Sequence, residues 1–394
     1  MSYFRILFLL AVLTAFPPMS TSMYLPALPL LQAQWGVDLS TVNLTLVLFF
    51  AFFSVSLLGY GPVSDSHGRR PLLMIGIGIY IPASLLCGTA SDVEHMIAAR
   101  ILQAVGAASA SALAMAIAKD LFQAHERQQM LAHLGIVVAL APMLAPIVGG
   151  WVLEWFGWPW IFFIQATWGT IAFIGVWCMP EPLQNKVPAR FRQVLSRYLR
   201  LMYNRRFMTL NALMALSSTP LFAFVASSPA IYISHFHAGP QYFGLFFGAN
   251  ALALMFGSFM CSRLTRRRPG WVLLQLGFAG MLVGGLAIGV LGVRGPISFG
   301  VCMFLLTFCI GLTRPLSNNL VLEQVNEDVG TASSLLVFLF FAGGAGAMAL
   351  ISLDWPNRVH VIGWLAVGCG STLLLAFQWM ARYWKDALHA VKPR

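Results

Sequence analysis

The sequence predicts an all-α integral membrane protein of twelve transmembrane helices, arranged as two six-helix pseudo-repeats. Of its 394 residues, 59% are hydrophobic and only 9% are charged, whereas a soluble domain carries about 25% charged residues. Such a chain has too few charges to cover a water-facing surface, so we expect no soluble domain. Apolar runs of membrane-spanning length recur along the chain, and basic residues fall in the loops between them.

The apolar runs, taken in order, are separated by polar residues or by Pro and Gly. We expect spans near Phe4–Leu31, Ser40–Tyr60, Leu72–Ala90, Met96–Ala118, Met130–Trp151, Trp158–Met179, Phe207–Ser234, Tyr242–Cys261, Trp271–Val293, Ile297–Leu320, Thr331–Leu353 and Val359–Met380. Although Arg5 and the following apolar run are similar to a signal peptide, no clear cleavage site follows. We therefore expect the first run to be a retained span.

The basic residues predict the orientation of the chain. One side of the membrane holds Arg69, Arg70, Lys119, Arg127, Lys186, Arg190, Arg192, Arg197, Arg200, Arg205, Arg206, Arg263, Arg266, Arg267, Arg268, Arg382, Lys385, Lys392 and Arg394, whereas the other holds Arg294 and Arg358. Cytoplasmic loops carry the excess of Lys and Arg, so we expect both termini to be cytoplasmic in an inner (plasma) membrane. Because the net charge of +11 lies in short loops, it does not indicate nucleic-acid binding.

The longest polar stretch divides six spans from six. We expect a six-helix bundle over residues 1–180, a basic amphipathic linker over residues 181–206 that lies on anionic lipid, and a second bundle over residues 207–394. The halves form a weak parallel repeat. Gly257 and the Arg266–Arg268 run stand where Gly61 and Arg69–Arg70 stand in the first half, although the second copy lacks the acid at Asp65.

The stretch from Gly61 to Pro71 is a tight turn between two spans. We expect Gly61 to let a neighbouring helix approach closely, and Asp65 to reach the N-terminus of another helix, where a carboxylate is favoured. Gly68 permits the reversal, while Arg69 and Arg70 supply positive charge. The alternative is a positive-inside loop with no further role.

This turn resembles the signature loop of the major facilitator superfamily, Gly-x-x-x-Asp-x-x-Gly-Arg-Arg/Lys. The match consists of Gly61, Asp65, Gly68, Arg69 and Arg70, with every spacing kept. The resemblance implies a cytoplasmic gate that closes the outward-facing state. Asp120, at the end of the fourth span, is the expected ionic partner of Arg69 or Arg70; the alternative is a solvated charge at a helix end.

The first span contains Tyr24 within a Met23–Pro29 segment whose prolines free backbone carbonyls. The segment predicts a kink, or simply the end of the helix. It resembles the first helix of the Bcr/CflA branch of drug:proton antiporters. Ser22 replaces the aspartate that is usual in that branch, which puts proton coupling through the first helix in doubt.

Arg100 is the sharpest candidate for a functional residue. It lies about six residues into the fourth span, where a buried arginine is costly and therefore faces a wet cavity or a partner; the alternative is a side chain that snorkels outward. Gln103 lies on the same helix face, and Gly106 offers a small packing surface. The stretch resembles the Arg-x-x-Gln-x-x-Gly motif of the superfamily, which is tied to substrate and proton coupling.

The fifth span carries Pro142, Pro146, Gly149 and Gly150, which resemble the antiporter motif of the superfamily and predict a hinge. The alternative is a packing helix that tolerates Gly and Pro. His133 is the histidine with a plausible inner position. Asn250 is an intramembrane amide that either lines the cavity or joins two helices.

No Asp or Glu lies near the middle of a predicted span. With Arg100 inside and no acid opposite it, the cavity is expected to be neutral or positive, which favours a neutral or anionic substrate. We expect an alternating-access transporter that exports a small drug or metabolite and uses the proton gradient, working as a monomer. The alternative is a facilitator or importer of an organic acid or metal chelate. A membrane enzyme is disfavoured because no catalytic constellation, metal spacing or cofactor loop is present, so we expect no cofactor.

Overall fold

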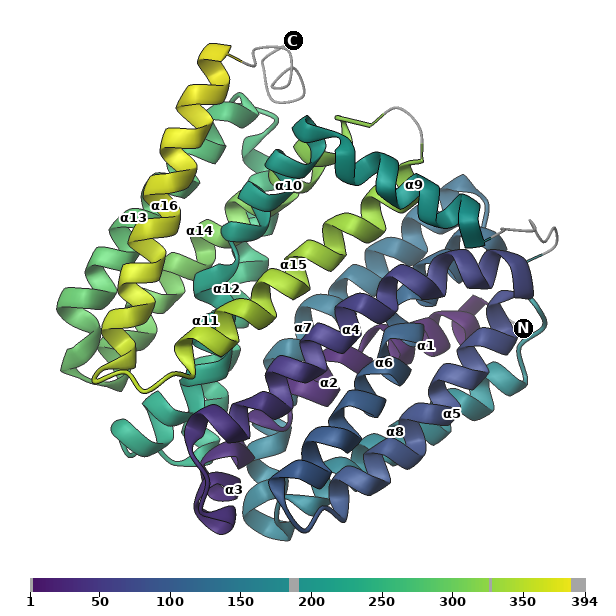
Figure 1. Ribbon diagram of the computed structural model, residues 1–394, viewed down its shortest axis with the longest axis horizontal. Helices are drawn as coiled ribbons and strands as arrows, with labels where there is room; N and C mark the ends of the chain where they lie inside the picture. The colour runs from purple at the N-terminus through teal and green to yellow at the C-terminus, as the bar shows by residue number, and fades with distance from the viewer. Residues whose placement is uncertain (1–2, 184–190, 326–327, 384–394) are drawn as a thin grey trace. The chain divides into compact units, whose positions relative to one another are not determined.

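A computed structural model describes residues 3–183, 191–325 and 328–383. Part of the predicted linker, residues 184–190, lies outside these ranges, as do Lys186, Arg190, Lys385, Lys392 and Arg394. All regular elements in the described ranges are helical, and twelve helical stretches there are long and apolar enough to cross a membrane (Figure 1). The predicted fold class is confirmed.

The chain divides into two compact units. The first contains residues up to Val194 together with Pro240–Gly244. Its elements are α1 (Tyr3–Thr14), α2 (Phe16–Ser22), the 3₁₀ turn η1 (Leu25–Ala27), α3 (Leu28–Trp35), α4 (Leu39–His67), α5 (Arg69–Gly88), α6 (Val93–Leu121), α7 (Ala124–Phe156) and α8 (Pro159–Trp177).

The first span is built from four short pieces because prolines interrupt it. Pro26 and Pro29 have no N–H to donate to the carbonyls four residues earlier, and the chain passes through the 3₁₀ turn η1 between α2 and α3. Gly36, with φ 62°, then ends α3. The predicted kink over Met23–Pro29 is confirmed.

The second unit contains Leu195–Gly239 and the residues from Leu245 onward. Its elements are most of α9 (Phe191–Tyr203), α10 (Arg205–Leu216), α11 (Thr219–Pro229), the π-helix η2 (Ala230–His235), α12 (Pro240–Leu264), α13 (Gly270–Leu291), the 3₁₀ turn η3 (Gly292–Arg294), α14 (Pro296–Leu322), α15 (Val329–Ile351) and α16 (Arg358–Tyr383). The sequence-based boundaries at residues 180 and 206 stay a prediction.

The seventh span, α10 to η2, is also discontinuous. At Ser227–Tyr232, α11 continues through Pro229 into η2, so the helix there changes type without stopping. The interruption lies instead at Ser217 and Ser218, just before Pro220. Pro220 cannot bond the carbonyl of Leu216, which explains the position of the break.

The two units repeat the same packing. In the first, α5 packs against α6 and α8, and α2 packs against α7; in the second, α13 packs against α14 and α16, and α11 packs against α15. These pairs join corresponding spans of each half. Glycines bring the backbones close: a Cβ on Gly106 of α6 would lie 2.7 Å from the carbonyl oxygen of Gly76 on α5, and one on Gly285 of α13 would lie 2.7 Å from that of Gly363 on α16.

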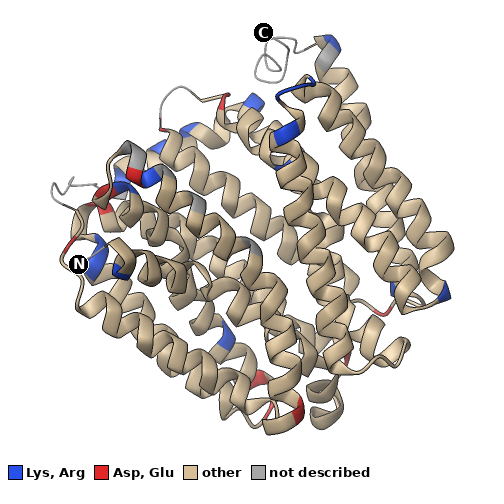
Figure 2. Cartoon of the chain, turned by 180° about the vertical axis from the view of Figure 1, so that it is seen from behind, with Lys and Arg blue, Asp and Glu red and all other residues tan. Residues whose placement is uncertain are grey.

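Charged residues lie mostly near the ends of the helices in each unit, as Figure 2 shows. In the first unit, Arg69 begins α5 and Lys119 lies in the last turn of α6, whereas Asp92 precedes α6 at its opposite end. The linker helix α9 exposes Leu195 and Leu199. Such an exposed apolar stripe on a basic helix suits a lipid surface.

Candidate functional site

Arg100 lies inside the first unit, at the start of the third turn of α6. Asp92 caps this helix by accepting a hydrogen bond from the backbone N–H of His95. The Arg100 side chain is 0% exposed. Its Nη1 donates to the carbonyl oxygen of Ser20 at 2.7 Å and to Oε1 of Gln103 at 2.5 Å. The arginine therefore points into the helix bundle and does not snorkel outward.

Two aromatic rings cover the guanidinium of Arg100. Its Cζ lies 4.3 Å from the centre of the Phe49 ring and 5.1 Å from that of Tyr24. Such cation–π contacts contribute roughly 2 kcal/mol or more each when they are desolvated. The Tyr24 hydroxyl lies 3.3 Å from Oγ1 of Thr45, which fixes the ring above the cation.

Gln103 joins Arg100 to three other helices. Its Nε2 donates to Oγ of Ser84 on α5 and to Oε1 of Gln165 on α8, both at 2.8 Å. Gln165 in turn donates from Nε2 to the carbonyl oxygen of Met19 on α2, at 3.0 Å. A buried amide network of this kind holds each member in one orientation, so the position of the guanidinium is set by all four helices.

The hydrogen-bonding capacity of Arg100 is only partly used. Among the described residues, its Nε and Nη2 have no hydrogen-bond partner, and no carboxylate forms an ion pair with it. A buried charge without an anion is strongly destabilising. The arrangement thus retains the capacity to bind an anion or a strong acceptor at these two nitrogens.

The predicted cavity residues fall into two groups. Tyr24, Arg100 and Gln103 come together in the first unit as described above, whereas Asn250 belongs to α12 in the second. There Oδ1 of Asn250 accepts a hydrogen bond from Thr307 of α14 at 3.0 Å, and its Nδ2 donates to Phe246. Asn250 therefore joins two helices, which is the second of the two roles open to it. The role of all four in substrate binding stays a prediction.

The charged turn after α4 is organised around Arg69, which is 8% exposed. Its Nε binds Oδ2 of Asp120 at 2.8 Å, and its Nη1 lies 2.6 Å from Oδ1 of Asp65. Nη1 also donates to Oγ of Ser64. The structure thus pairs Asp120 with Arg69, one of its two expected partners, while the role of this cluster as a gate stays a prediction.

Glu181, which the sequence did not single out, occupies the N-terminus of α5. Its carboxylate accepts hydrogen bonds from the backbone N–H groups of Arg69 at 2.8 Å and Arg70 at 3.2 Å. The expectation that Asp65 would occupy such a helix terminus is wrong, because Asp65 pairs with the Arg69 side chain. Gly68 is required twice here: its φ is 108°, and a Cβ on it would lie 2.6 Å from Oε2 of Glu181.

Arg70 turns away from the acids. Its Nη2 and Nε donate to the carbonyl oxygens of Trp177 at 2.7 Å and Val176 at 3.3 Å, at the end of α8. Cations are favoured at helix C-termini because the last carbonyls lack partners. Arg70 therefore fastens the start of α5 to the end of α8.

Gly61 and His133 lie in surroundings that differ from those predicted, and the hinge in α7 is still to be tested. No atom lies within 4 Å of a Cβ placed on Gly61, so the close helix approach expected there is not formed. His133 is exposed, with Nδ1 3.5 Å from the Tyr3 hydroxyl, and does not point inward. α7 continues through Pro142 and Pro146 to Phe156 and includes Gly149 and Gly150; its function as a hinge stays a prediction.

Twelve helices of membrane-spanning length among the described residues, packed in two units that repeat the same contacts, define a polytopic membrane protein. The family model of the Major Facilitator Superfamily matches residues 10–348. The chain belongs to the Major Facilitator Superfamily. It is therefore a secondary transporter and a multi-pass membrane protein, not an enzyme.

The chain is similar to several known members of the superfamily. It is 27% identical over 361 residues to the bicyclomycin resistance protein homolog of Haemophilus influenzae, covering 89% of each chain. It is 23% identical over 359 residues to the multidrug resistance protein MdtL of Salmonella typhi, covering 91% of this chain and 90% of that one. The crystal structure of a D-xylose-proton symporter shares the fold with a TM-score of 0.75 and 15% identity, over 96% of this chain and 97% of that chain. The resemblance to a drug-efflux branch of the superfamily is confirmed.

Proposed function

We propose that this transporter exports a small neutral or anionic drug or metabolite, using the proton gradient, and that Arg100 lies at its central site. The observation that carries the proposal is the fully buried guanidinium whose Nε and Nη2 have no hydrogen-bond partner among the described residues. A lipophilic cation is disfavoured there because no carboxylate offsets the charge of Arg100. The drug-resistance names of the relatives support export.

The proposed mechanism is alternating access between two six-helix halves, residues 1–180 and 207–394. Tyr24 and Gln103 line the site with Arg100 in the first unit. Gly61, Asp65, Gly68, Arg69, Arg70 and Asp120 form the cytoplasmic gate, and Pro142, Pro146, Gly149 and Gly150 form the hinge. The compact ion pairs of Arg69 support the gate, because they are formed by residues of the turn and of α6 together.

We also propose an inner (plasma) membrane location with both termini cytoplasmic, and a monomer. The linker of residues 181–206 lies on anionic lipid in this proposal, supported by the exposed Leu195 and Leu199 of its described part. The basic helix ends support the orientation.

The second candidate function is a facilitator or importer of an organic acid or a metal chelate. Ser22 favours it, since this buried residue at the end of α2 stands where the drug-exporting branch usually has an acid. A carrier without that carboxylate loses one route for a coupled proton.

Flux into proteoliposomes separates the two functions. A panel of labelled acids and neutral drugs is scored with and without an imposed pH gradient. Proton-driven export requires that an inward proton gradient accelerates substrate movement in the opposite direction, and that Arg100→Ala abolishes it while expression is unchanged. Flux that ignores the pH gradient supports the facilitator, and robust transport of a cationic dye overturns the substrate class.

A further inference from the structure

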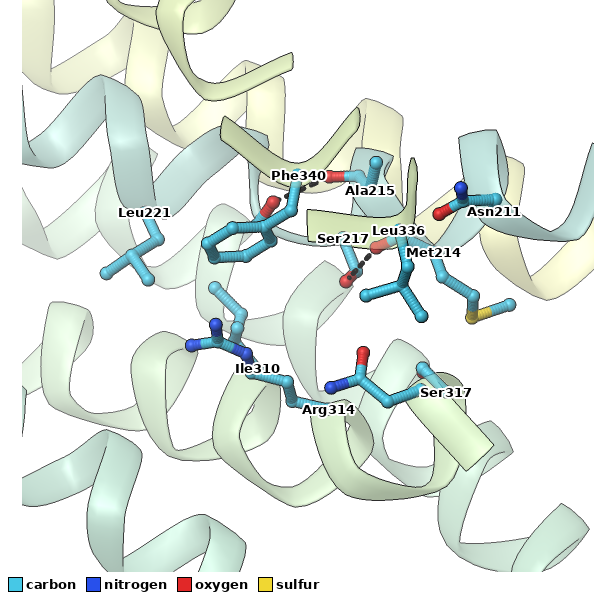
Figure 3. A pocket seen from close by; sticks show the side chains of 12 residues that line it. Asn211, Met214, Ala215, Ser217, Leu221, Ile310, Arg314, Ser317, Leu336 and Phe340 are labelled. Carbon is cyan, nitrogen blue, oxygen red and sulfur yellow. Dashed lines mark hydrogen bonds between the residues drawn. The ribbon is translucent and has the colours of Figure 1, made fainter. Parts of the chain in front are cut away.

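A small pocket lies inside the second unit, at the break between α10 and α11. Ser217 and Ser218 of the break, Asn211 of α10, and Arg314 and Ser317 of α14 line it, with Phe340 of α15 facing Arg314 (Figure 3). Its volume is ≈ 20 Å³, about the room that one water molecule needs. Asn318, at its rim, is exposed, so the pocket has an open side.

Arg314 places a positive charge in this pocket without an anion to match it. Its Cζ lies 4.2 Å from the centre of the Phe340 ring. Among the described residues it forms no ion pair and no hydrogen bond, and none of the residues that line the pocket is acidic. Because Phe340 covers a face of the planar guanidinium, the N–H groups in its plane stay available as donors.

Ser317 adds a second unused group at the same place. It lies three residues after Arg314 and therefore on the same face of α14. The residue is 2% exposed, and its hydroxyl has no hydrogen-bond partner. A buried hydroxyl without a partner is destabilising, so a ligand that accepts from it is favoured.

The neighbouring serines use their own donors at the break. The hydroxyls of Ser217 and Ser218 donate to the carbonyls of Met214 and Ala215, each at 2.6 Å, which satisfies two acceptors at the end of α10. The N-terminus of α11 begins beside the pocket at Thr219. The positive end of a half-helix inside a membrane span favours an anion.

We propose that this pocket binds the carboxylate of a small organic acid, with the planar guanidinium of Arg314 and the hydroxyl of Ser317 as its donors. A carboxylate matches the flat donor fork of arginine. The remainder of the ligand extends through the open side at Asn318. This site narrows the proposed substrate class from neutral or anionic molecules to carboxylic acids. It rests on the proposed function in one respect, which is that the bound acid is taken to be the transported substrate.

The test measures binding at equilibrium, without a membrane gradient. Purified full-length protein in detergent is titrated with sodium benzoate against sodium chloride at constant ionic strength, and the unfolding temperature is recorded. We expect a saturable increase with benzoate and none with benzamide, its uncharged analogue. Arg314→Gln weakens the apparent affinity for benzoate about tenfold or more, and Ser317→Ala weakens it about threefold.

Arg263→Gln is the matched control. Arg263 also lies over a phenylalanine in the same unit, with Cζ 5.2 Å from the centre of the Phe259 ring, but it is exposed; we expect its benzoate response to equal that of the wild type. If Arg314→Gln folds poorly, Arg314→Lys replaces it. This variant keeps the charge but lacks the planar pair of donors, so it should show an intermediate loss of apparent affinity for benzoate. The proposal is overturned by an equal response to benzamide, by no saturable response to benzoate, or by responses of Arg314→Gln and Ser317→Ala that match the wild type.

Transport separates this proposal from the function proposed above. Saturable benzoate binding that depends on Arg314, combined with the absence of proton-driven flux, refutes proton-driven export and leaves the carboxylate site standing. Proton-driven flux of a neutral substrate without any benzoate binding refutes the carboxylate site alone.

Discussion

Arg100 and Gln103, one turn apart on α6, form a hydrogen bond of 2.5 Å that joins the buried cation to an amide network. Gln103 uses its other amide atom, Nε2, on Ser84 and Gln165, so it cannot rotate without losing bonds to two helices. The hydrogen bonds of Gln103 therefore fix the orientation of the Arg100 guanidinium, and its Nε and Nη2 keep a fixed direction.

Arg100→Lys should reduce transport at least about tenfold, although it keeps the charge. An ammonium group cannot lie flat over Phe49 while donating to both Ser20 and Gln103 in the geometry of Arg100. The initial rate of substrate flux in proteoliposomes measures the effect. Wild-type flux in Arg100→Lys would show that charge alone, and not the shape of arginine, is needed.

Gln165→Leu should lower the free energy of unfolding by about 1–2 kcal/mol, because Gln103 and the Met19 carbonyl each lose a partner inside the bundle. Unfolding in a denaturing detergent measures the change. Gln275→Leu is the control, since Gln275 of α13 makes no hydrogen bond among the described residues, and it should change the stability by less than about 0.5 kcal/mol. Equal losses in both variants would contradict the network.

Gly68→Ala should destabilise the protein by about 1–3 kcal/mol and Gly61→Ala should have little effect. An alanine at Gly68 meets both a positive φ and the carboxylate of Glu181, whereas a methyl group at Gly61 enters open space. The difference in melting temperature between the two variants is the measurement. This comparison tests whether the two glycines of one motif have different physical roles. Equal melting temperatures of Gly68→Ala and Gly61→Ala would contradict the structure of the turn.

Asp120→Asn should weaken the unit by about 1–3 kcal/mol, since Arg69 is nearly buried and loses one of its two carboxylates. A double-mutant cycle with Arg69→Gln measures the coupling, and we expect more than about 1 kcal/mol. Asp38→Asn is the control because the Asp38 side chain makes no capping bond to α4. Additive effects of Asp120→Asn and Arg69→Gln would show that the pair contributes nothing.

The N-cap of α6 should open in acid. The backbone N–H of His95 and then its ring lower the pKa of Asp92 to about 2, below the value of about 3.9 in an unfolded chain. The carboxylate therefore stabilises the folded cap above pH ~4, and this contribution is lost as the pH falls through about 2. Hydrogen exchange at His95, corrected for intrinsic rates, should accelerate over that interval. Asp92→Asn should remove the acceleration, and an unchanged pH profile in that variant would contradict the assignment.

Much of the architecture was predictable because the membrane restricts it. Length and hydropathy located all twelve spans, and the prolines located the Met23–Pro29 kink. A pairing of Asp120 with Arg69 or Arg70 was expected because the topology returns the ends of α4 and α6 to one side, and the structure selects Arg69. These features depend only on local composition and on the fact that successive spans end on alternating sides of the membrane.

Other features depended on side-chain reach, which spacing does not encode. Glu181 lies 112 positions from the N–H group that it binds, and no pattern near it distinguished it from a solvated acid. Gln165 was visible as an intramembrane amide, a signal that could have found it. The open surroundings of Gly61 and the exposure of His133 were missed because a single sequence gives the face of a residue only when the helix has a clear polar stripe, and α4 and α7 do not.

The contact between Gly76 and Gly106 brings backbone directly against backbone, with Tyr80 also within 2.7 Å of the Cβ position on Gly106. No layer of side chains separates α5 from α6 at this point to absorb a displacement by changing rotamer. We therefore expect α5 and α6 to move as one rigid pair, which carries the charged turn at one end and Arg100 further along.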